Sequence, residues 1–163
     1  MIRIPITDKM LAKANNLYHF RNLPGSITAG KSQIYGAIGE VMVINYFKGK
    51  DILFEPTFDY DMVIDGHKID VKTKKTTVVP MPDYFCSISC YNTHQKCDYY
   101  FFTRVMEDKT EGFLLGYIGK DEFYKKAQKK NKGDLDVNGF VFKDDCYNIM
   151  VKELHQFKYA ANR

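Results

Sequence analysis

The order of apolar and polar residues along the chain predicts strands in its middle, with helices before and after them. Short apolar runs rich in aromatic and β-branched residues are typical of central strands, and they occur at residues 84–91, 97–105 and 112–119. Apolar residues recur at helical spacing in SQIYGAIGEVMVINYF, residues 32–47, where Ser32 can cap the N-terminus. Residues 120–130 predict a short helix, with acidic residues at its start and lysines near its end, as the helix dipole favours.

The apolar pattern is less regular at residues 76–85 and from residue 138 onwards. Pro80 and Pro82 predict a loop or a bent strand exit between residues 76 and 85. Asn138-Gly139 predicts a turn, with a strand at 139–143 and a final strand or helix through residue 157. This order of elements suits a single α/β domain, residues 1–163, in which a mixed β-sheet is flanked by α-helices.

Residues 60–74 predict a β-hairpin. Asp65-Gly66 is a strong signal for a two-residue turn, because both positions of a type I′ turn need positive φ. A two-residue turn fixes the register, so that residues opposite each other share a face. One face then collects the residues of a core, Tyr60, Met62, Ile64, His67, Ile69 and Val71. The opposite face collects Asp59, Asp61, Val63, Lys68, Asp70, Lys72 and Lys74.

This register predicts that Asp61 and Asp70 lie side by side, roughly 5 Å apart between their Cβ atoms, with Lys72 on the same face. Two carboxylates so close destabilise each other unless a cation compensates. Mg²⁺ suits the pair, because it binds one or two carboxylates together with waters and phosphate oxygens. Lys72 could then orient or deprotonate an attacking water, or stabilise charge on a phosphate. The alternative is a solvated hairpin face with ion-paired side chains.

The helix predicted at residues 32–47 contains a glutamate, Glu40, in a mostly apolar segment. Burying it is costly unless it is paired or binds a ligand. Gly36 and Gly39 lower helix stability, but they allow close approach to a neighbouring backbone. A helix pressed onto the sheet could bring Glu40 to the edge of the Asp pair. The alternative is a surface glutamate on an amphipathic helix.

These segments together resemble the PD-(D/E)xK nuclease superfamily, whose members share the restriction-endonuclease-like fold. GAIGE, which ends in Glu40, is similar to the helix motif of that superfamily. YD is similar to its first acidic motif at Asp61, and DVK to its core motif at Asp70 and Lys72. Tyr60 stands where the motif nominally has proline, a position that the superfamily treats loosely.

The resemblance covers roughly residues 31–105 and implies a restriction-endonuclease-like mixed sheet flanked by helices. It implies that Asp61 and Asp70 bind metal with help from the Val71 carbonyl. It implies further that Lys72 is the catalytic lysine and that Glu40 is an accessory metal ligand or an orienting residue.

The formal net charge of +4 is compatible with binding to nucleic acid, but a charge this small does not identify a nucleic-acid-binding protein. The candidate phosphate contacts are Lys31, Lys74, Lys75, Lys96, Lys129 and Lys130. The alternative for the dense basic run at 125–134 is a solvated helix face. In YNTHQK, residues 91–96, Asn92 and Gln95 could hydrogen-bond bases or the attacking water. They could equally close a polar turn between two strands.

Cysteine usage and hydropathy favour a cytosolic protein with reduced thiols. The sequence has no secretory signal and no run near the ~18 apolar residues of a membrane span. Cys86, Cys90, His94 and Cys97 could form a zinc site, but common zinc spacings are tighter. The remaining cysteine is Cys146, and His19, His67 and His155 are isolated residues interpreted as core or surface histidines.

We therefore expect a metal-dependent endodeoxyribonuclease that hydrolyses DNA by in-line attack of a metal-bound water. Mg²⁺ is the expected cofactor, and Mn²⁺ a substitute. We expect a homodimer, because its two sites could cut both strands of DNA. We expect the protein in the cytoplasm or, if a phage encodes it, in the cytoplasm of the host cell. One alternative is a catalytically silent nucleic-acid-binding module on the same fold, and another is a nuclease-like subunit that needs partner proteins. The intact set of Glu40, Asp61, Asp70 and Lys72 argues against the silent module.

Overall fold

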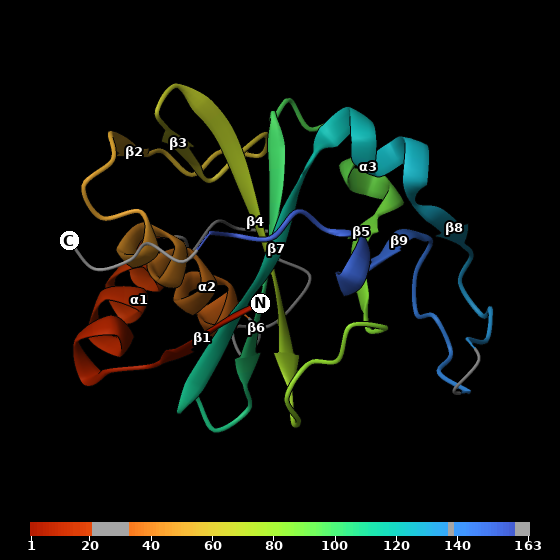
Figure 1. The fold of residues 1–163 in the computed structure, drawn as a ribbon, viewed down its shortest axis with the longest axis horizontal. Coiled ribbons are helices and arrows are strands. Elements are labelled where there is room, and N and C mark those ends of the chain that lie inside the picture. Colours follow the sequence, from red (N-terminus) through yellow and green to blue (C-terminus); the bar gives the residue numbers. More distant parts are fainter. Residues whose placement is uncertain (21–32, 137–138, 159–163) are drawn as a thin grey trace.

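A six-stranded mixed sheet forms the middle of the molecule in the computed structural model, which describes residues 1–20, 33–136 and 139–158. Its strand order is β1-β7-β6-β4-β3-β2 (Figure 1). The strands are β1 (Ile2–Pro5), β2 (Ile52–Phe54), β3 (Met62–Ile64), β4 (His67–Thr76), β6 (Tyr99–Met106) and β7 (Glu111–Gly119). Strands β4 and β6 pair in parallel, whereas the other neighbours in this sheet are antiparallel.

Two helices, α1 (Asp8–Phe20) and α2 (Gln33–Tyr46), cover one face of this sheet (Figure 1). Helix α2 is mostly apolar and is buried over residues 37–43, with Ile38, Val41 and Met42 fully buried. They belong to one hydrophobic core together with Ile69 and Val71 of β4. The odd-numbered residues of β4 near its start therefore face the helices, because side chains alternate along a strand.

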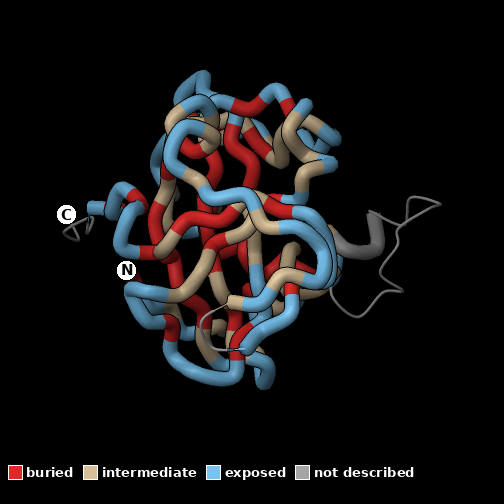
Figure 2. The backbone as a smooth tube through the Cα atoms, turned by 90° about the vertical axis from the view of Figure 1, so that its right-hand side faces the viewer, coloured by how far each residue is buried: buried red, intermediate tan, exposed pale blue. Residues whose placement is uncertain are grey.

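A smaller sheet and a third helix cover the opposite face (Figure 1). The sheet has the order β5-β9-β8 and consists of β5 (Phe85–Ser89), β8 (Gln128–Lys130) and β9 (Cys146–Met150). Helix α3 (Lys120–Lys126) and the short 3₁₀ helices η1 (Cys90–His94) and η2 (Val151–Glu153) lie on the same side. A second core joins Ile88 and Ile149 of the small sheet to Tyr100 and Phe102 of β6. Buried backbone accordingly runs through the middle of the molecule (Figure 2).

The sequence pattern predicted much of this architecture. The mixed sheet, the helix at 32–47 and the strands at 97–105 and 112–119 are confirmed, although Ser32 lies outside the described residues. Neither β1 nor α1 was predicted. The restriction-endonuclease-like topology stays a prediction, since what the structure establishes is a mixed α/β fold.

Three local predictions were wrong. Residues 84–91 do not form a central strand, because β5 is an edge strand of the smaller sheet and ends in η1. The helix predicted at 120–130 ends at Lys126, since Ala127 adopts extended angles (φ −67°, ψ 142°) and β8 follows. Residues 139–143 contribute one isolated bridge, Leu135 to Val141, and no strand.

The β3–β4 hairpin has the predicted turn, and its three strand pairs have the predicted register. The prediction for Tyr60 was wrong, because Tyr60 packs against the core on the side of the smaller sheet. Asp65 and Gly66 both have positive φ, 47° and 83°, as a type I′ turn requires. Met62 pairs with Ile69, and Ile64 with His67. His67 is nevertheless exposed, whereas the other three of these residues are buried in the α2 core.

Gly39 lets α2 lie very close to the sheet. A Cβ at position 39 would lie 2.6 Å from Thr103 Oγ1 and closer still to Thr73 Oγ1, so a larger residue cannot fit without movement. These two hydroxyls hydrogen-bond to each other across β4 and β6 at 2.8 Å. The expectation for Gly36 was wrong, because nothing lies within 4 Å of a Cβ placed there. No helix among the described residues is long and apolar enough to cross a membrane.

The two glycines of α2 provide a matched test of this packing. Gly39→Ala should lower the free energy of unfolding by about 1–3 kcal/mol, because the added methyl overpacks the helix–sheet contact. Gly36→Ala should raise it by roughly 0.5–1 kcal/mol through helix propensity alone. Urea unfolding followed by circular dichroism would measure both. Equal stability of the two variants would contradict the close approach of α2.

Candidate active site

Asp70 is a carboxylate buried between the two sheets. It lies on β4 opposite Tyr100 of β6, which belongs to the core on the side of the smaller sheet. Only 3% of Asp70 is exposed. A buried charge is costly unless it is paired and hydrogen-bonded, so the partners of Asp70 define the site.

Two side chains hold the Asp70 carboxylate. The Lys72 Nζ lies 2.6 Å from Asp70 Oδ2, and the Gln95 Nε2 donates a hydrogen bond of 2.9 Å to Asp70 Oδ1. The Lys72 contact is a short ion pair, and it lowers the pKa of Asp70. A carboxylate oxygen has two lone pairs, so Oδ2 can accept a further ligand besides the Lys72 ammonium.

Gln95 is itself almost fully buried, with 3% exposed. Its Nε2 also donates to the Phe58 carbonyl at 2.7 Å, and its own backbone carbonyl accepts from the Lys120 ammonium at the start of α3. Its Oε1 has no hydrogen-bond partner among the described residues. Sequence reasoning offered Gln95 as a base contact or turn residue and missed that its amide holds Asp70.

Asp61 lies at the end of the β3–β4 pairing, next to Asp70. Its amide donates to the Ile69 carbonyl at 2.9 Å, and its Oδ2 accepts from the Val71 amide at 2.7 Å. The strand pairs of the hairpin end at Met62 and Ile69, so the direct pairing of Asp61 with Asp70 stays a prediction. The Val71 group that contacts Asp61 is the amide, and a role for the Val71 carbonyl in binding metal stays a prediction.

The electrostatics of Asp70 reflect both burial and its neighbours. Burial and, to a smaller extent, the Asp61 charge raise the pKa of Asp70, whereas Lys72 and Gln95 lower it, and the net result is a pKa of about 6. A carboxyl with a raised pKa beside a second carboxylate is typical of functional sites. Lys72 offsets only part of the effect of burial and of the Asp61 charge, so a further cation would be favourable beside the two carboxyls.

Glu40 is buried in α2, with 3% exposed. Helix α2 packs on the face of β4 that contains Ile69 and Val71, whereas Asp70 and Lys72 belong to the opposite face. Because Glu40 is buried, the alternative of a surface glutamate is wrong. The role of Glu40 as an accessory metal ligand stays a prediction.

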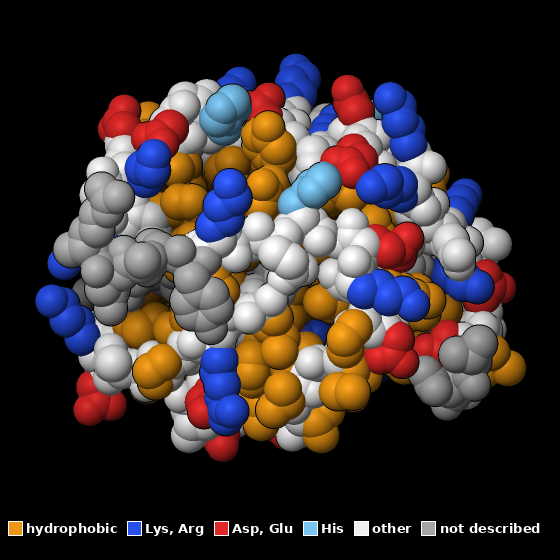
Figure 3. Space-filling model, viewed as in Figure 1, with side chains coloured by type: hydrophobic (Ala, Val, Ile, Leu, Met, Phe, Trp, Pro, Cys, Tyr) orange, Lys and Arg blue, Asp and Glu red, His pale blue; other side chains and the backbone are white. Residues whose placement is uncertain are grey.

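The predicted phosphate-binding lysines are spread over several elements. Lys31 lies outside the described residues, and Lys75 forms an exposed ion pair with Glu107. Lys129 and Lys130 lie on β8 rather than on a helix, so the basic run is not one helical face. Lys96 and Asn92 lie in or beside η1. On the face shown in Figure 3, basic side chains are scattered among acidic ones.

Lys74 and Arg104 form a second cationic group on the Asp70 face. They are paired in the β4–β6 register. The Lys74 Nζ donates to Ser87 Oγ at 2.7 Å, and Arg104 donates to the Phe85 carbonyl at 3.1 Å. Although the Lys74 residue as a whole is exposed, desolvation of its ammonium and the Arg104 charge both lower the pKa of Lys74.

Neither Lys74 nor Arg104 has a carboxylate partner among the described residues. Adjacent cations of this kind suit an anionic ligand such as phosphate. Arg104 was missed from the sequence, because it lies in an apolar run and only the parallel pairing of β4 with β6 places it beside Lys74.

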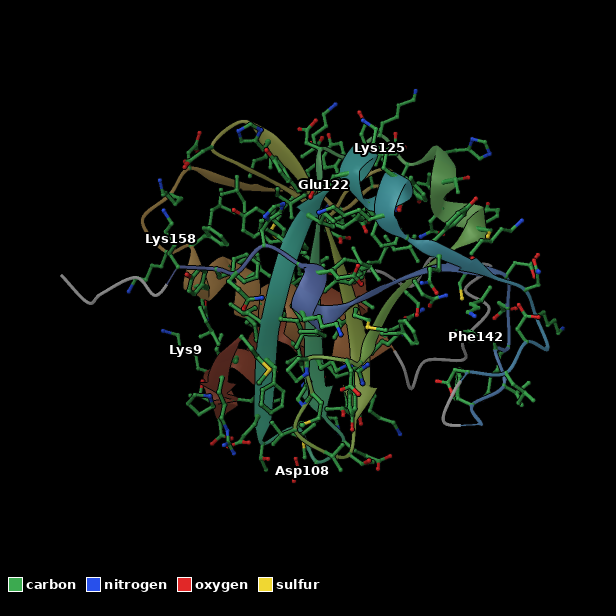
Figure 4. All side chains as sticks on the ribbon, turned by 45° about the vertical axis from the view of Figure 1, so that its right-hand side comes forward. Lys9, Asp108, Glu122, Lys125, Phe142 and Lys158 are labelled. Carbon is green, nitrogen blue, oxygen red and sulfur yellow. The ribbon has the colours of Figure 1, made fainter. Side chains whose placement is uncertain are left out.

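Within the part of the chain that the structure describes, the thiols and histidines do not gather into a metal site. All four cysteines are free, and burial raises the pKa of Cys86 to about 12 and that of Cys97 to about 11, so these thiols stay protonated. No cluster of three or more His, Cys, Asp or Glu residues among the described residues could hold a metal, so the zinc alternative is not supported. His155 pairs with Glu122 at 2.8 Å on the surface near α3 (Figure 4). The side chain of His19 lies outside the described part.

The Asp70 site still fits a hard cation that needs few protein ligands. Mg²⁺ binds through one or two carboxylates and completes its shell with water and phosphate oxygens. Asp61 and Asp70 can supply the carboxylates, and the unpartnered Gln95 Oε1 can accept from a bound water. Three described pockets, of about 530, 320 and 630 Å³, lie elsewhere, and Asp61, Asp70 and Lys72 line none of them.

No protein-family model matches the chain, and no curated protein matches it. The interpretation of the site therefore depends on the geometry of Asp61, Asp70, Lys72 and Gln95.

The raised pKa of Asp70 predicts a specific pH dependence of stability. Between about pH 4 and pH 6 the folded protein holds a proton on Asp70 that the unfolded chain has lost. The contribution of Asp70 to the free energy of unfolding is therefore fully present below about pH 4, and it is lost as the pH rises from about 4 through 6. In EDTA, the free energy of unfolding of the wild type minus that of Asp70→Asn should fall by roughly 2–3 kcal/mol between about pH 4 and pH 7.

Urea unfolding of both proteins across this pH range would measure the difference, and subtraction cancels the titrating groups that do not interact with Asp70. A difference that is constant, or that rises with pH, would show that Asp70 is not desolvated.

Proposed function

We propose that the protein is a metal-dependent endodeoxyribonuclease whose site is formed by Asp61, Asp70 and Lys72. The observation that supports this most is the buried Asp70 carboxylate, which lies 2.6 Å from Lys72 and beside a second carboxylate. Such an arrangement stabilises the fold poorly, because burial raises the pKa of Asp70 and Asp61 adds repulsion. Its chemistry suits the hydrolysis of a phosphodiester.

Each residue has a role that follows from its contacts. Asp61 and Asp70 would hold Mg²⁺, which supplies a Lewis acid for the phosphate and lowers the pKa of a bound water. Lys72 can donate to a phosphate oxygen or to the attacking water, because an ammonium has three N–H donors and Asp70 Oδ2 needs only one of them. Gln95 fixes the orientation of Asp70, since its amide bonds both Asp70 and the Phe58 carbonyl.

The cations on the same face can bind the DNA backbone. Lys72 and Lys74 are two residues apart on β4, so their Cα atoms are roughly 7 Å apart along the strand. Arg104 lies beside Lys74. Lys72 and Lys74 therefore follow each other along β4, with Arg104 beside Lys74 on β6, and the three cations can neutralise phosphates of a bound strand.

The alternative function is a module that binds nucleic acid without cutting it. The burial of Asp70 favours this alternative, because only 3% of the residue is exposed and Lys72 occupies the space beside it. In that case Asp70 and Lys72 would be a structural ion pair, while Lys74 and Arg104 would bind phosphates.

A cleavage assay with matched variants separates the two functions. Asp70→Asn and Lys72→Ala should each lower cleavage of plasmid or branched DNA at least about 100-fold, because each removes several kcal/mol of transition-state stabilisation. DNA affinity should change only a few-fold, since phosphate contacts remain. Lys50→Ala is the control, because Lys50 forms an exposed ion pair with Asp65 and is not one of the candidate phosphate contacts. It should retain cleavage.

The metal requirement is part of the same assay. Cleavage should be absent in EDTA, present with Mg²⁺ or Mn²⁺ and weak with Ca²⁺, whose longer and looser coordination is less suited to catalysis. Full cleavage in EDTA, or full activity of Asp70→Asn, would exclude the proposed site.

A further inference from the structure

Two exposed aromatic rings meet beside the Asp70 site. Phe58 lies in the segment between β2 and β3 and is 54% exposed, and Tyr91 lies in η1 and is 76% exposed. Their ring centroids are 5.8 Å apart, with an interplanar angle of 81°. Tyr91 is the most exposed large hydrophobic residue of the described chain.

Hydrogen bonds fix this aromatic pair relative to Asp70. The Gln95 amide bonds both the Phe58 carbonyl, at 2.7 Å, and Asp70 Oδ1, at 2.9 Å. The Lys96 amide donates to Asp59 Oδ1 at 3.0 Å, which gives a second link between the two segments. One buried side chain thus positions both the carboxylate and the backbone that carries the Phe58 ring.

The aromatic pair contributes little to the hydrophobic core. Neither Phe58 nor Tyr91 belongs to either buried cluster or packs against one. Most other aromatic contacts of the described chain are made within those clusters. The rings have polar neighbours in sequence, among them Asn92 and the exposed Lys96. Apolar ring faces within a polar and cationic rim match a nucleobase attached to a phosphate backbone.

We propose that Phe58 and Tyr91 form a stacking platform for an unpaired base next to the scissile phosphate. The bases of a continuous duplex are stacked on one another, so an aromatic side chain reaches a base face only where a nucleotide is unpaired or displaced. The substrate class is then single-stranded, flapped or branched DNA rather than continuous duplex. This inference rests on the proposed nuclease function for its substrate, but the binding that it describes can be measured without cleavage.

The test compares binding of two DNAs by fluorescence anisotropy in EDTA, which prevents cleavage. The double variant Phe58→Ala/Tyr91→Ala should bind a 12-nucleotide single strand at least about tenfold more weakly than the wild type, because stacking contributes ~1–3 kcal/mol per base. Its affinity for a blunt 12-base-pair duplex should change less than about threefold, because phosphate contacts dominate there. Thermal melting monitors the fold of each variant.

Phe140→Ala is the matched control. Phe140 is 53% exposed and also makes an edge contact with another ring, that of Phe142, at 5.4 Å. It lies in the segment that links β8 to β9, where Figure 4 labels Phe142. Its removal should leave both affinities unchanged.

The variant Phe58→Trp tests the platform without removing an aromatic ring. The chain has no tryptophan, so Phe58→Trp introduces a single reporter at the platform. Its fluorescence should be quenched when the single strand binds and not when the duplex binds. No quenching, or an equal loss of affinity for both DNAs in the double variant, would overturn the platform.

The outcomes also separate this inference from the proposed function. A protein that cleaves DNA but whose double variant keeps wild-type binding to single strands has the activity without the platform. If the Phe58→Trp variant is quenched by single strands but the wild type never cleaves, the protein has the platform without the activity.

Discussion

The enclosure of the Asp70 carboxylate between two sheets is the constraint on which the arrangement of the site depends. Burial raises its pKa to about 6, and Asp61 adds a like charge next to it. The fold compensates with Lys72 from the same strand and with Gln95 from the segment after η1. The close packing of α2 through Gly39 holds β4 and β6 from the other side. A carboxylate supported in this way is rigid, which is what a catalytic site needs.

The parts of the molecule that depend on local sequence could be predicted. Asp65-Gly66 determines the turn, and the turn determines the register over Met62–Ile64 and His67–Ile69. Asp61 lies just before these strand pairs, where its charge acts on Asp70. The smaller sheet could not be predicted, because an apolar run such as β5 does not specify which strand it pairs with. Gln95 reaches Asp70 across 25 residues, and only the parallel pairing of β4 with β6 brings Arg104 beside Lys74.

The proposed chemistry combines groups from four segments on one side of the main sheet. Strand β4 provides Asp70, Lys72 and Lys74, and β6 adds Arg104. The segment before β3 and helix η1 provide the exposed aromatic pair, which Gln95 links to Asp70. Acidic, cationic and aromatic groups are those that a metal, a phosphate backbone and an unpaired base respectively require. On the other side of the main sheet, the buried residues between the sheet and helices α1 and α2 form an apolar core, and α2 also buries the charged residue Glu40.

The most direct test of this account is whether the DNA-free protein binds a divalent cation through Asp70. Titration with Mn²⁺, followed by the electron paramagnetic resonance signal of the free ion, counts the bound ions without any assay of activity. The account predicts one bound ion in the wild type and in Lys75→Ala, and loss of that ion in Asp70→Asn. Equal Mn²⁺ binding by the wild type and Asp70→Asn, or none by the wild type, would contradict it.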